Sequence, residues 1–167
     1  MIIGNGSVAR VLEDRDDLVF FASGVSNSSC KDENEYQREF NLLKTVPVDQ
    51  HVVYFSNLGI YYKEDRYTQH KINMEEYIRT HYKSYTIVRI EVCEWVTTPH
   101  TILNFFKTQL SQGIEPVIQD TTRYVLSLDE FLYWVRMIKS GVKNEMNILG
   151  RKMTIAEIVE AIKQNKL

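Results

Sequence analysis

The sequence has little of several features that mark specialised classes of protein. It contains only three prolines in 167 residues and no low-complexity tract, which excludes long linkers and extended disorder. Its two cysteines, Cys30 and Cys93, stand far apart, so we expect free thiols and a reducing cytoplasm. No apolar run approaches the roughly 20 residues that a membrane helix needs. The first residues, MIIGNG, also lack the basic start and apolar core of a secretory signal.

Neither sign of charge is in large excess. The formal net charge of −2 provides no electrostatic footprint for nucleic acid or for an acidic membrane, and we expect neither partner. Hydrophobic residues make up 44% of the chain and charged residues 25%, which is ordinary for a soluble globular protein. We find no metal-ligand spacing among His, Cys and acidic residues, and we interpret His70 and His81 as solvent-facing.

Buried strands alternate with helical segments along the chain. Short β-branched and aromatic runs predict strands at residues 1–3, 18–22, 51–55 and 85–89. We expect helices over about residues 7–13, 32–44 and 67–82, with the charged residues of the second helix on a solvated face. This alternation is typical of an α/β fold with a mostly parallel sheet flanked by helices.

The last third of the chain carries several helix-start signals. Thr98-Pro99 predicts one helix start, and capping boxes at Ser127 and Thr154 predict two more. Residues 115–118 are interpreted as a short strand. We therefore expect one domain over residues 1–167, with a small C-terminal lobe of about 113–167.

A glycine-containing turn follows the first strand directly. Residues 4–9, Gly-Asn-Gly-Ser-Val-Ala, match the G-x-G-x-x-A pattern of dinucleotide-binding turns. Gly4 would allow the tight turn, and Gly6 would let a pyrophosphate approach the backbone. The N-terminus of the following helix would then attract the phosphates. The alternative is a tight strand-to-helix turn that binds nothing.

A tyrosine and a lysine lie four residues apart in the helix after the central strand. Tyr67 and Lys71 share a helix face, and a nearby ammonium group favours the phenolate. The pattern thus predicts a lowered tyrosine pKa and an acid/base group near neutral pH. In a chain with 10 tyrosines, such a pair can also arise by accident. Ser56 and Asn57 add small polar groups at the end of the strand, where open α/β sheets bind ligands.

The order of these motifs resembles a known family. A strand, Ser-x-x-x-x-Tyr from Ser56 to Tyr61, and Tyr-x-x-x-Lys opening a helix resemble the extended short-chain dehydrogenase/reductases, the NAD-dependent sugar epimerases and dehydratases. The segment LVFFASGVSNS at 18–28 is similar to the family's fourth strand, which ends near the nicotinamide. The resemblance therefore implies a truncated Rossmann-like fold, without the second and third strands that hold the adenosine half of the cofactor.

The resemblance also implies roles for individual residues. Tyr67 would be the acid/base group and Lys71 its activator, while Asn57 or Ser56 would contact the substrate oxygen. Asn57 stands where the family has a hydroxyl residue, and it cannot share a hydroxyl proton. The implied cofactor is NAD, bound more weakly than in full-length relatives, and the implied ligand is a nucleotide or nucleotide sugar. The implied cofactor-binding residues are Gly4, Asn5, Gly6, Ser7, Val8, Ala22, Ser23 and Gly24.

Two functions stay open at this point. The Tyr67/Lys71 pair and the glycine turn favour an NAD-dependent epimerase/dehydratase-like enzyme. The missing strands and Asn57 favour a catalytically silent Rossmann-like module for binding, structure or assembly. The family pairs two helices across a homodimer, here those of about 32–45 and 67–82. The apolar residues that would serve this interface, or face the core instead, are Tyr36, Phe40, Leu43, Met74 and Ile78.

Overall fold

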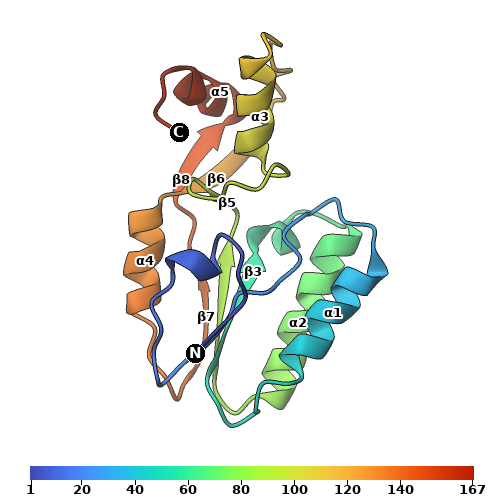
Figure 1. Cartoon of the computed structure of the whole chain (residues 1–167), viewed down its shortest axis with the longest axis vertical. Helices are drawn as coiled ribbons and strands as arrows, with labels where there is room; N and C mark the ends of the chain where they lie inside the picture. The colour runs from blue at the N-terminus through green and yellow to red at the C-terminus, as the bar shows by residue number, and fades with distance from the viewer.

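The larger of two sheets has five strands, all parallel. The computed structural model describes residues 1–167 and is shown in Figure 1. The strand order is β1-β2-β3-β4-β7, so that β1 forms one edge. The strands are β1 (Ile2–Ile3), β2 (Val19–Phe21), β3 (Val52–Asn57), β4 (Tyr85–Ile90) and β7 (Lys143–Asn147). The expected α/β class and the expected order of the first four strands are confirmed.

Helices cover both faces of this sheet. The helices α1 (Glu33–Leu43) and α2 (Arg66–His81) pack on one face, and α4 (Leu128–Arg136) packs on the other (Figure 1). Side chains of β3 alternate between the two layers. Val52 and Tyr54 pack with α1 and α2, whereas Val53 and Phe55 pack with α4. Burial on both faces explains why the first four residues of this strand are an unbroken apolar run.

The start of α2 is fixed by its own side chains. The Asp65 carboxylate accepts a hydrogen bond from the Thr68 backbone N–H at 2.8 Å, and the Asp65 N–H donates to the Thr68 hydroxyl at 3.1 Å. This reciprocal capping box satisfies donors that the first helical turn leaves free. Because Tyr67 and Lys71 lie in the first two turns of α2, the cap helps to set the position of both.

The first crossover is shorter than predicted. In place of a helix over residues 7–13, the chain forms one 3-10 turn, η1 (Ala9–Val11). The chain must return to β2 by Val19, and a polar turn in which Asp14 pairs with the amino terminus at 2.6 Å takes up the remaining length. The predicted helix dipole behind the glycine turn is therefore largely missing.

A small lobe stands at the carboxyl end of the large sheet, at the top of Figure 1. Its sheet has the order β5-β6-β8, with the first pair parallel and the second antiparallel. Its elements are β5 (Val92–Cys93), α3 (Ile102–Ser111), β6 (Thr122–Leu126), β8 (Arg151–Thr154) and α5 (Ile155–Lys163). The expected lobe boundary near residue 113 is wrong, because β5 and α3 belong to the lobe while α4 and β7 belong to the large sheet.

Two local predictions in this region are also wrong. Helix α3 begins after Thr101, because the Asn104 side chain donates to the carbonyls of Val96 and Thr98 and folds residues 96–101 into a turn. Residues 115–118 form no strand, and Val117 is 80% exposed. The helix starts predicted at Ser127 and Thr154 are confirmed, with a reciprocal capping box at Thr154.

Most of the apolar residues considered for a dimer interface face the core. Tyr36, Leu43, Met74 and Ile78 are buried within the monomer. Only Phe40 is partly exposed, and its ring meets that of Tyr77 edge-on at 5.0 Å. A homodimer therefore stays a prediction that light scattering would test, and it would have to use other residues on the outer surface of α1 and α2.

Candidate functional site

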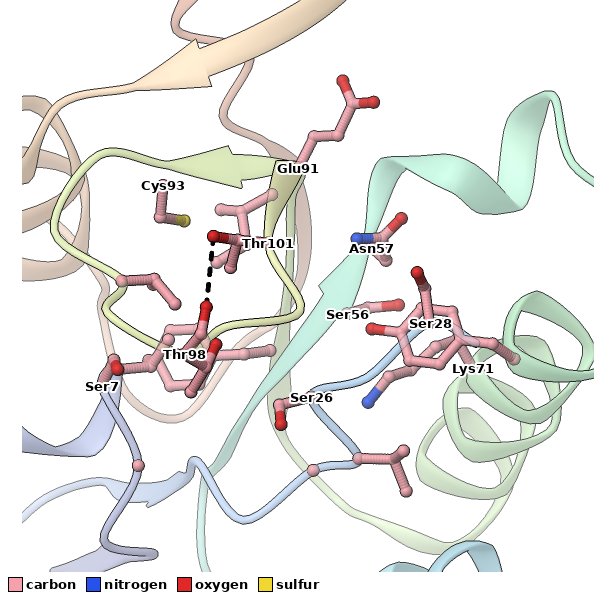
Figure 2. Close-up of a pocket in the computed structure, with 18 of the residues that line it drawn as sticks. Ser7, Ser26, Ser28, Ser56, Asn57, Lys71, Glu91, Cys93, Thr98 and Thr101 are labelled. Atoms are coloured by element: carbon pink, nitrogen blue, oxygen red, sulfur yellow. Dashed lines mark hydrogen bonds between the residues drawn. The ribbon is translucent and has the colours of Figure 1, made fainter. Parts of the chain in front are cut away.

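A cleft of about 460 Å³ opens at the carboxyl ends of β1 to β4, between the large sheet and the small lobe (Figure 2). In Figure 2, Ser56 and Asn57 lie at the end of β3, between Lys71 on one side and Cys93, Thr98 and Thr101 on the other. The cleft brings together residues from turns and helices far apart in the sequence. The predicted site residues that line it are Asn5, Gly6, Ser7, Val8, Ala22, Ser23, Gly24, Ser56, Asn57, Tyr67 and Lys71.

The glycine turn after β1 forms one wall. Gly4 has a φ of +134°, and a Cβ atom built there would lie 2.4 Å from the Ala22 carbonyl oxygen. Position 4 therefore requires glycine because the turn packs directly on the end of β2. A Cβ atom at Gly6 would meet nothing within 4 Å, so the backbone there is open to the cleft.

A buried ion pair lies beneath the opposite wall. The Lys71 ammonium donates to Glu39 Oε1 at 2.9 Å and to the Tyr54 hydroxyl at 3.0 Å. Glu39 also accepts from the Tyr54 hydroxyl at 2.8 Å and the Val25 backbone N–H at 2.7 Å, and it contacts His70 Nε2 at 3.0 Å. Although burial opposes ionisation, Lys71 and these hydrogen bonds hold the pKa of Glu39 well below its usual value.

Two predictions about this cluster are wrong. The Glu39 side chain is fully buried, although it was assigned to the solvated face of its helix, and His70 is buried as well. The sequence did carry a signal, since Glu39 lies three residues after Tyr36 and four before Leu43, on the apolar stripe of α1. An acidic residue on such a stripe indicates a buried partner.

Tyr67 lies in the cleft wall with its ring near the lysine. The Lys71 ammonium is 5.6 Å from the centre of the Tyr67 ring. Burial raises the pKa of Tyr67, and this effect outweighs the opposing influence of Lys71. The predicted net lowering of the tyrosine pKa is therefore wrong for this structure, because burial disfavours the phenolate more than the ammonium favours it, and the Glu39 carboxylate adds a smaller effect in the same direction as burial.

Ser56 and Asn57 already have partners within the protein. The Ser56 hydroxyl donates to Glu75 Oε1 at 2.6 Å. Asn57 Oδ1 accepts from the Gly59 backbone N–H at 2.7 Å and caps η2 (Leu58–Tyr61). The Ser56 oxygen can still accept a hydrogen bond, and Asn57 keeps its amide N–H groups for a ligand.

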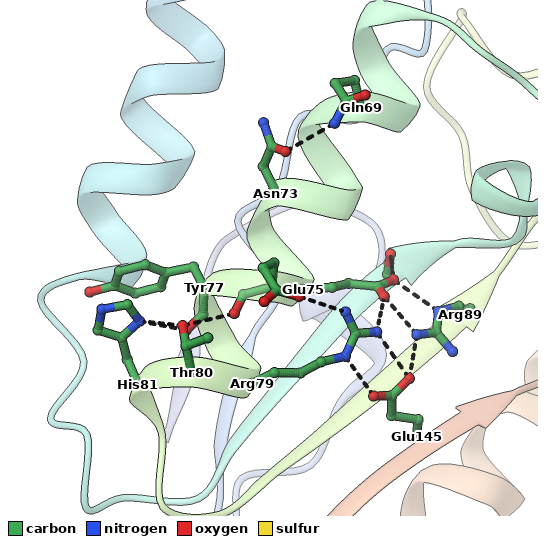
Figure 3. A network of polar contacts seen from close by, with 11 residues as sticks. Gln69, Asn73, Glu75, Tyr77, Arg79, Thr80, His81, Arg89 and Glu145 are labelled. Atoms are coloured by element: carbon green, nitrogen blue, oxygen red, sulfur yellow. Dashed lines mark hydrogen bonds and ion pairs between the residues drawn. The ribbon is translucent and has the colours of Figure 1, made fainter.

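Behind Ser56, a charged network ties α2 to the large sheet (Figure 3). Glu75 accepts from Arg89 on β4 and from Arg79 on its own helix, and both arginines also pair with Glu145 on β7. The two guanidinium groups lower the pKa of Glu145 to about 2. Arg89 thus links β4 to α2 and to β7.

The lobe side of the cleft carries residues that sequence reasoning did not single out. Arg123 on β6 lies 3.7 Å from Glu91, whose carboxylate also accepts from the Tyr124 backbone N–H and the Tyr62 hydroxyl. Lys63, Arg38 and His100 also line the cleft. These basic groups give the cleft several positions at which a phosphate could be bound. No motif indicated them, because they come from separate segments of the chain, with Arg38 on α1, Lys63 before α2 and Arg123 on β6.

The Cys93 thiol also lines the cleft. Burial raises the pKa of Cys93 to about 12, so the reactive thiolate is scarce near neutral pH. No group of three His, Cys, Asp or Glu side chains is arranged to hold a metal ion. No helix has both the length and the apolar character to cross a membrane.

Comparison with known proteins reveals similarity at the level of structure. No protein-family model and no curated protein sequence matches the chain. The Bordetella bronchiseptica enzyme WbmG in complex with NAD and UDP superposes with a TM-score of 0.66 at 15% identity, over 90% of this chain and 56% of that one. The dTDP-4-dehydrorhamnose reductase of Bacillus anthracis in complex with NADP gives 0.68 at 12% identity, over 89% and 62%.

RMD from Pseudomonas aeruginosa, complexed with NADPH, gives a TM-score of 0.62 at 14% identity, over 89% of this chain and 63% of that one. The chain thus spans about three fifths of the length of these solved structures. At this level of identity the similarity establishes the fold, which is the Rossmann-like fold of these three proteins.

Proposed function

We propose that this chain binds a nucleotide sugar in the cleft and acts as a shortened NAD-dependent epimerase/dehydratase-like protein. The observation that carries the proposal is the lining of the cleft. It joins the open backbone at Gly6, the Tyr67 phenol, the Lys71 ammonium and the Ser56 hydroxyl at the carboxyl ends of parallel strands, where such folds bind ligands. The solved structures with this fold contain NAD, NADP, NADPH or UDP, which supports the ligand class.

The residues present fit one half of NAD better than the other. Gly4 lacks the Cβ that would clash with Ala22, and Gly6 presents open backbone where a pyrophosphate would approach. The nicotinamide ribose would lie near Lys71, and the ring near residues 22–24. For the adenosine half there is no strand beyond β1 to form a groove. When bound, NAD would supply a hydride acceptor; the chain itself supplies positioning and proton transfer.

Tyr67 would donate and accept the proton at its phenolic oxygen. Because burial raises its pKa, the group rests as a neutral phenol and is poised first as an acid. Lys71 would hold neighbouring hydroxyl groups, and the Ser56 oxygen would accept a hydrogen bond from the ligand while donating to Glu75. Arg123 and Lys63 would bind the phosphates of the nucleotide. We also place the protein in the cytoplasm, where its two free thiols would stay reduced.

A catalytically silent binding module is the second candidate, and specific contacts favour it. Asn57 replaces a hydroxyl residue and uses its side-chain oxygen as a helix cap, while Ser56 donates its proton to Glu75. The positive charge of Lys71 is compensated by Glu39. On this account the cleft would bind a nucleotide sugar without turning it over.

Calorimetric titration with several nucleotide sugars, NAD and NADP tests the ligand class, with Gly6→Val as the control variant. A Cβ atom at Gly6 has no protein atom within 4 Å, so we expect the variant to fold normally while its side chain occupies the approach to the turn. We expect at least one nucleotide sugar to bind the wild-type protein and to lose affinity in Gly6→Val. The proposal fails if no nucleotide sugar binds, or if the variant binds it equally well.

A further inference from the structure

The buried pair of Glu39 and Lys71 sets the charge of one part of the cleft. The Lys71 side chain is 3% exposed and lines the cleft, whereas that of Glu39 is fully buried behind it. In Figure 2 the Lys71 nitrogen points towards the segment that carries Ser26. Two of the three ammonium N–H groups are used within the protein, by Glu39 and by Tyr54. One N–H is therefore left for a ligand.

The segment after β2 packs closely against this ammonium group. A Cβ atom at Gly24 would lie 2.8 Å from Lys71 Nζ and 3.1 Å from Glu39 Oε1. Any larger residue at this position would press on both members of the pair. The Val25 backbone N–H, one residue further along, donates to Glu39 and fixes the segment against it. Glycine at position 24 thus lets the segment pack against the pair without displacing the Lys71 ammonium, and the Lys71 side chain still lines the cleft.

The charge balance at this point differs from that of an anion site. A phosphate bound to the free N–H of Lys71 would face the Glu39 carboxylate, which lies 2.9 Å from the same nitrogen. In a site shielded from water, this repulsion would cancel most of the attraction to the ammonium. A neutral hydroxyl group accepts the Lys71 hydrogen bond without that repulsion.

We propose that Glu39 is a specificity-determining residue of the cleft. It neutralises Lys71 from behind, so that this part of the cleft receives a neutral hydroxyl group, such as that of a ribose, and excludes a phosphate or carboxylate. The inference rests on the proposed function only in taking the cleft as the ligand site. Phosphates belong instead to the open turn at Gly6 and to the basic residues that line other parts of the cleft.

Inorganic phosphate is the probe, and calorimetry at low ionic strength measures its affinity. Glu39→Gln keeps the size of the side chain and removes its charge, which leaves the Lys71 charge uncompensated. We expect this variant to bind phosphate about tenfold to a hundredfold more tightly than the wild-type protein, the usual strength of a hydrogen bond to a charged group. The double variant Glu39→Gln/Lys71→Met should return to the wild-type affinity.

Tyr54→Phe is the matched control. It removes another hydrogen-bond partner of Lys71 from the same buried site, but it leaves the Glu39 charge in place. We expect its phosphate affinity to equal that of the wild-type protein. An equal gain in Tyr54→Phe and Glu39→Gln would overturn the proposal, because loosened packing would then explain both. So would an unchanged affinity in a folded Glu39→Gln protein.

A measurement on the wild-type protein covers the case in which Glu39→Gln does not fold. Phosphate is titrated into protein with isotope-labelled lysine, and the NMR signal of Lys71 is followed. We expect no shift of that signal, whereas a saturable shift would show Lys71 binding the anion and contradict the inference. Failure of the proposed function is a separate result, namely no binding of any nucleotide sugar to the wild-type protein.

Discussion

A buried ion pair stabilises a protein only while both charges are present. Lys71→Met would leave the Glu39 carboxylate buried without its cation, at a cost of about 3–5 kcal/mol in the free energy of unfolding. Glu39→Gln/Lys71→Met removes both charges and should recover most of this loss. Urea denaturation of the two variants measures the difference. Equal stability of the single and the double variant would contradict this account of the pair.

The Glu39 carboxylate should make the stability of the protein depend on pH. In the folded protein the pKa of Glu39 lies well below 4.5, its ordinary value. The folded state therefore binds fewer protons than the unfolded state, so Glu39 contributes stability above about pH 4.5 and loses it as the pH falls further. We expect Glu39→Gln to show a shallower loss of stability than the wild-type protein below that pH, in denaturation series at several pH values. Parallel curves would refute the assignment.

Tyr67 separates the two proposed functions. If the protein turns over a nucleotide sugar, Tyr67→Phe should abolish turnover and leave ligand affinity nearly intact, because the phenol acts in proton transfer. Tyr61→Phe is a suitable control, since the Tyr61 hydroxyl is exposed and bonds to Asn147 on β7. Product formation and calorimetry together provide the comparison. Activity that survives Tyr67→Phe would exclude this residue as the acid/base group.

At the scale of elements, the cap of α2 should affect both stability and the cleft. Asp65→Ala removes the capping box and should cost about 1 kcal/mol in unfolding free energy. Thr154→Ala removes the other reciprocal box, at the start of α5 in the lobe, for a similar cost. Because only α2 carries Tyr67 and Lys71, ligand affinity should fall in Asp65→Ala and stay unchanged in Thr154→Ala. Equal affinities in both variants would show that the cap does not position the site.

The first four strands of the large sheet could be predicted from sequence because each is a local signal, whereas β7, with the mostly polar residues 143–147, gave none. Residues 52–55 form an unbroken apolar run, and Ser127 and Thr154 have side chains of the kind that begin helices. The lobe was less predictable, since β5 has only two residues and depends on pairing with β6, about thirty residues later in the chain. The contacts of Glu39 and Arg123 likewise join distant segments that no local pattern connects.

In the candidate site, too, local patterns could be predicted from the sequence, whereas contacts between distant segments could not. The glycine turn and the Tyr67/Lys71 spacing could be recognised, because backbone approach and helix faces follow directly from the order of residues. The pKa of Tyr67 could not, because it depends on burial and on a carboxylate from another helix. A spacing predicts which side chains lie together; the surrounding charges decide what these side chains do.

At the scale of the whole molecule, the position of β1 determines how a dinucleotide could bind. In this sheet β1 is the edge strand, so the cleft extends from the glycine turn towards β4 and the lobe, and not to the other side of β1. The nicotinamide mononucleotide half of NAD would contact the glycine turn, Lys71 and Tyr67. The adenosine half would extend past the edge of the sheet, with neither a groove nor a ribose-binding carboxylate.

One comparison of affinities tests this account most directly. We predict that NAD and nicotinamide mononucleotide bind the wild-type protein with dissociation constants within about tenfold of each other, because the adenosine half adds few contacts. Calorimetric titration of both ligands, repeated with Gly6→Val to confirm the site, measures the ratio. An affinity for NAD that is a hundredfold or more above that for the mononucleotide, or binding of NAD in the low-micromolar to nanomolar range, would contradict the account.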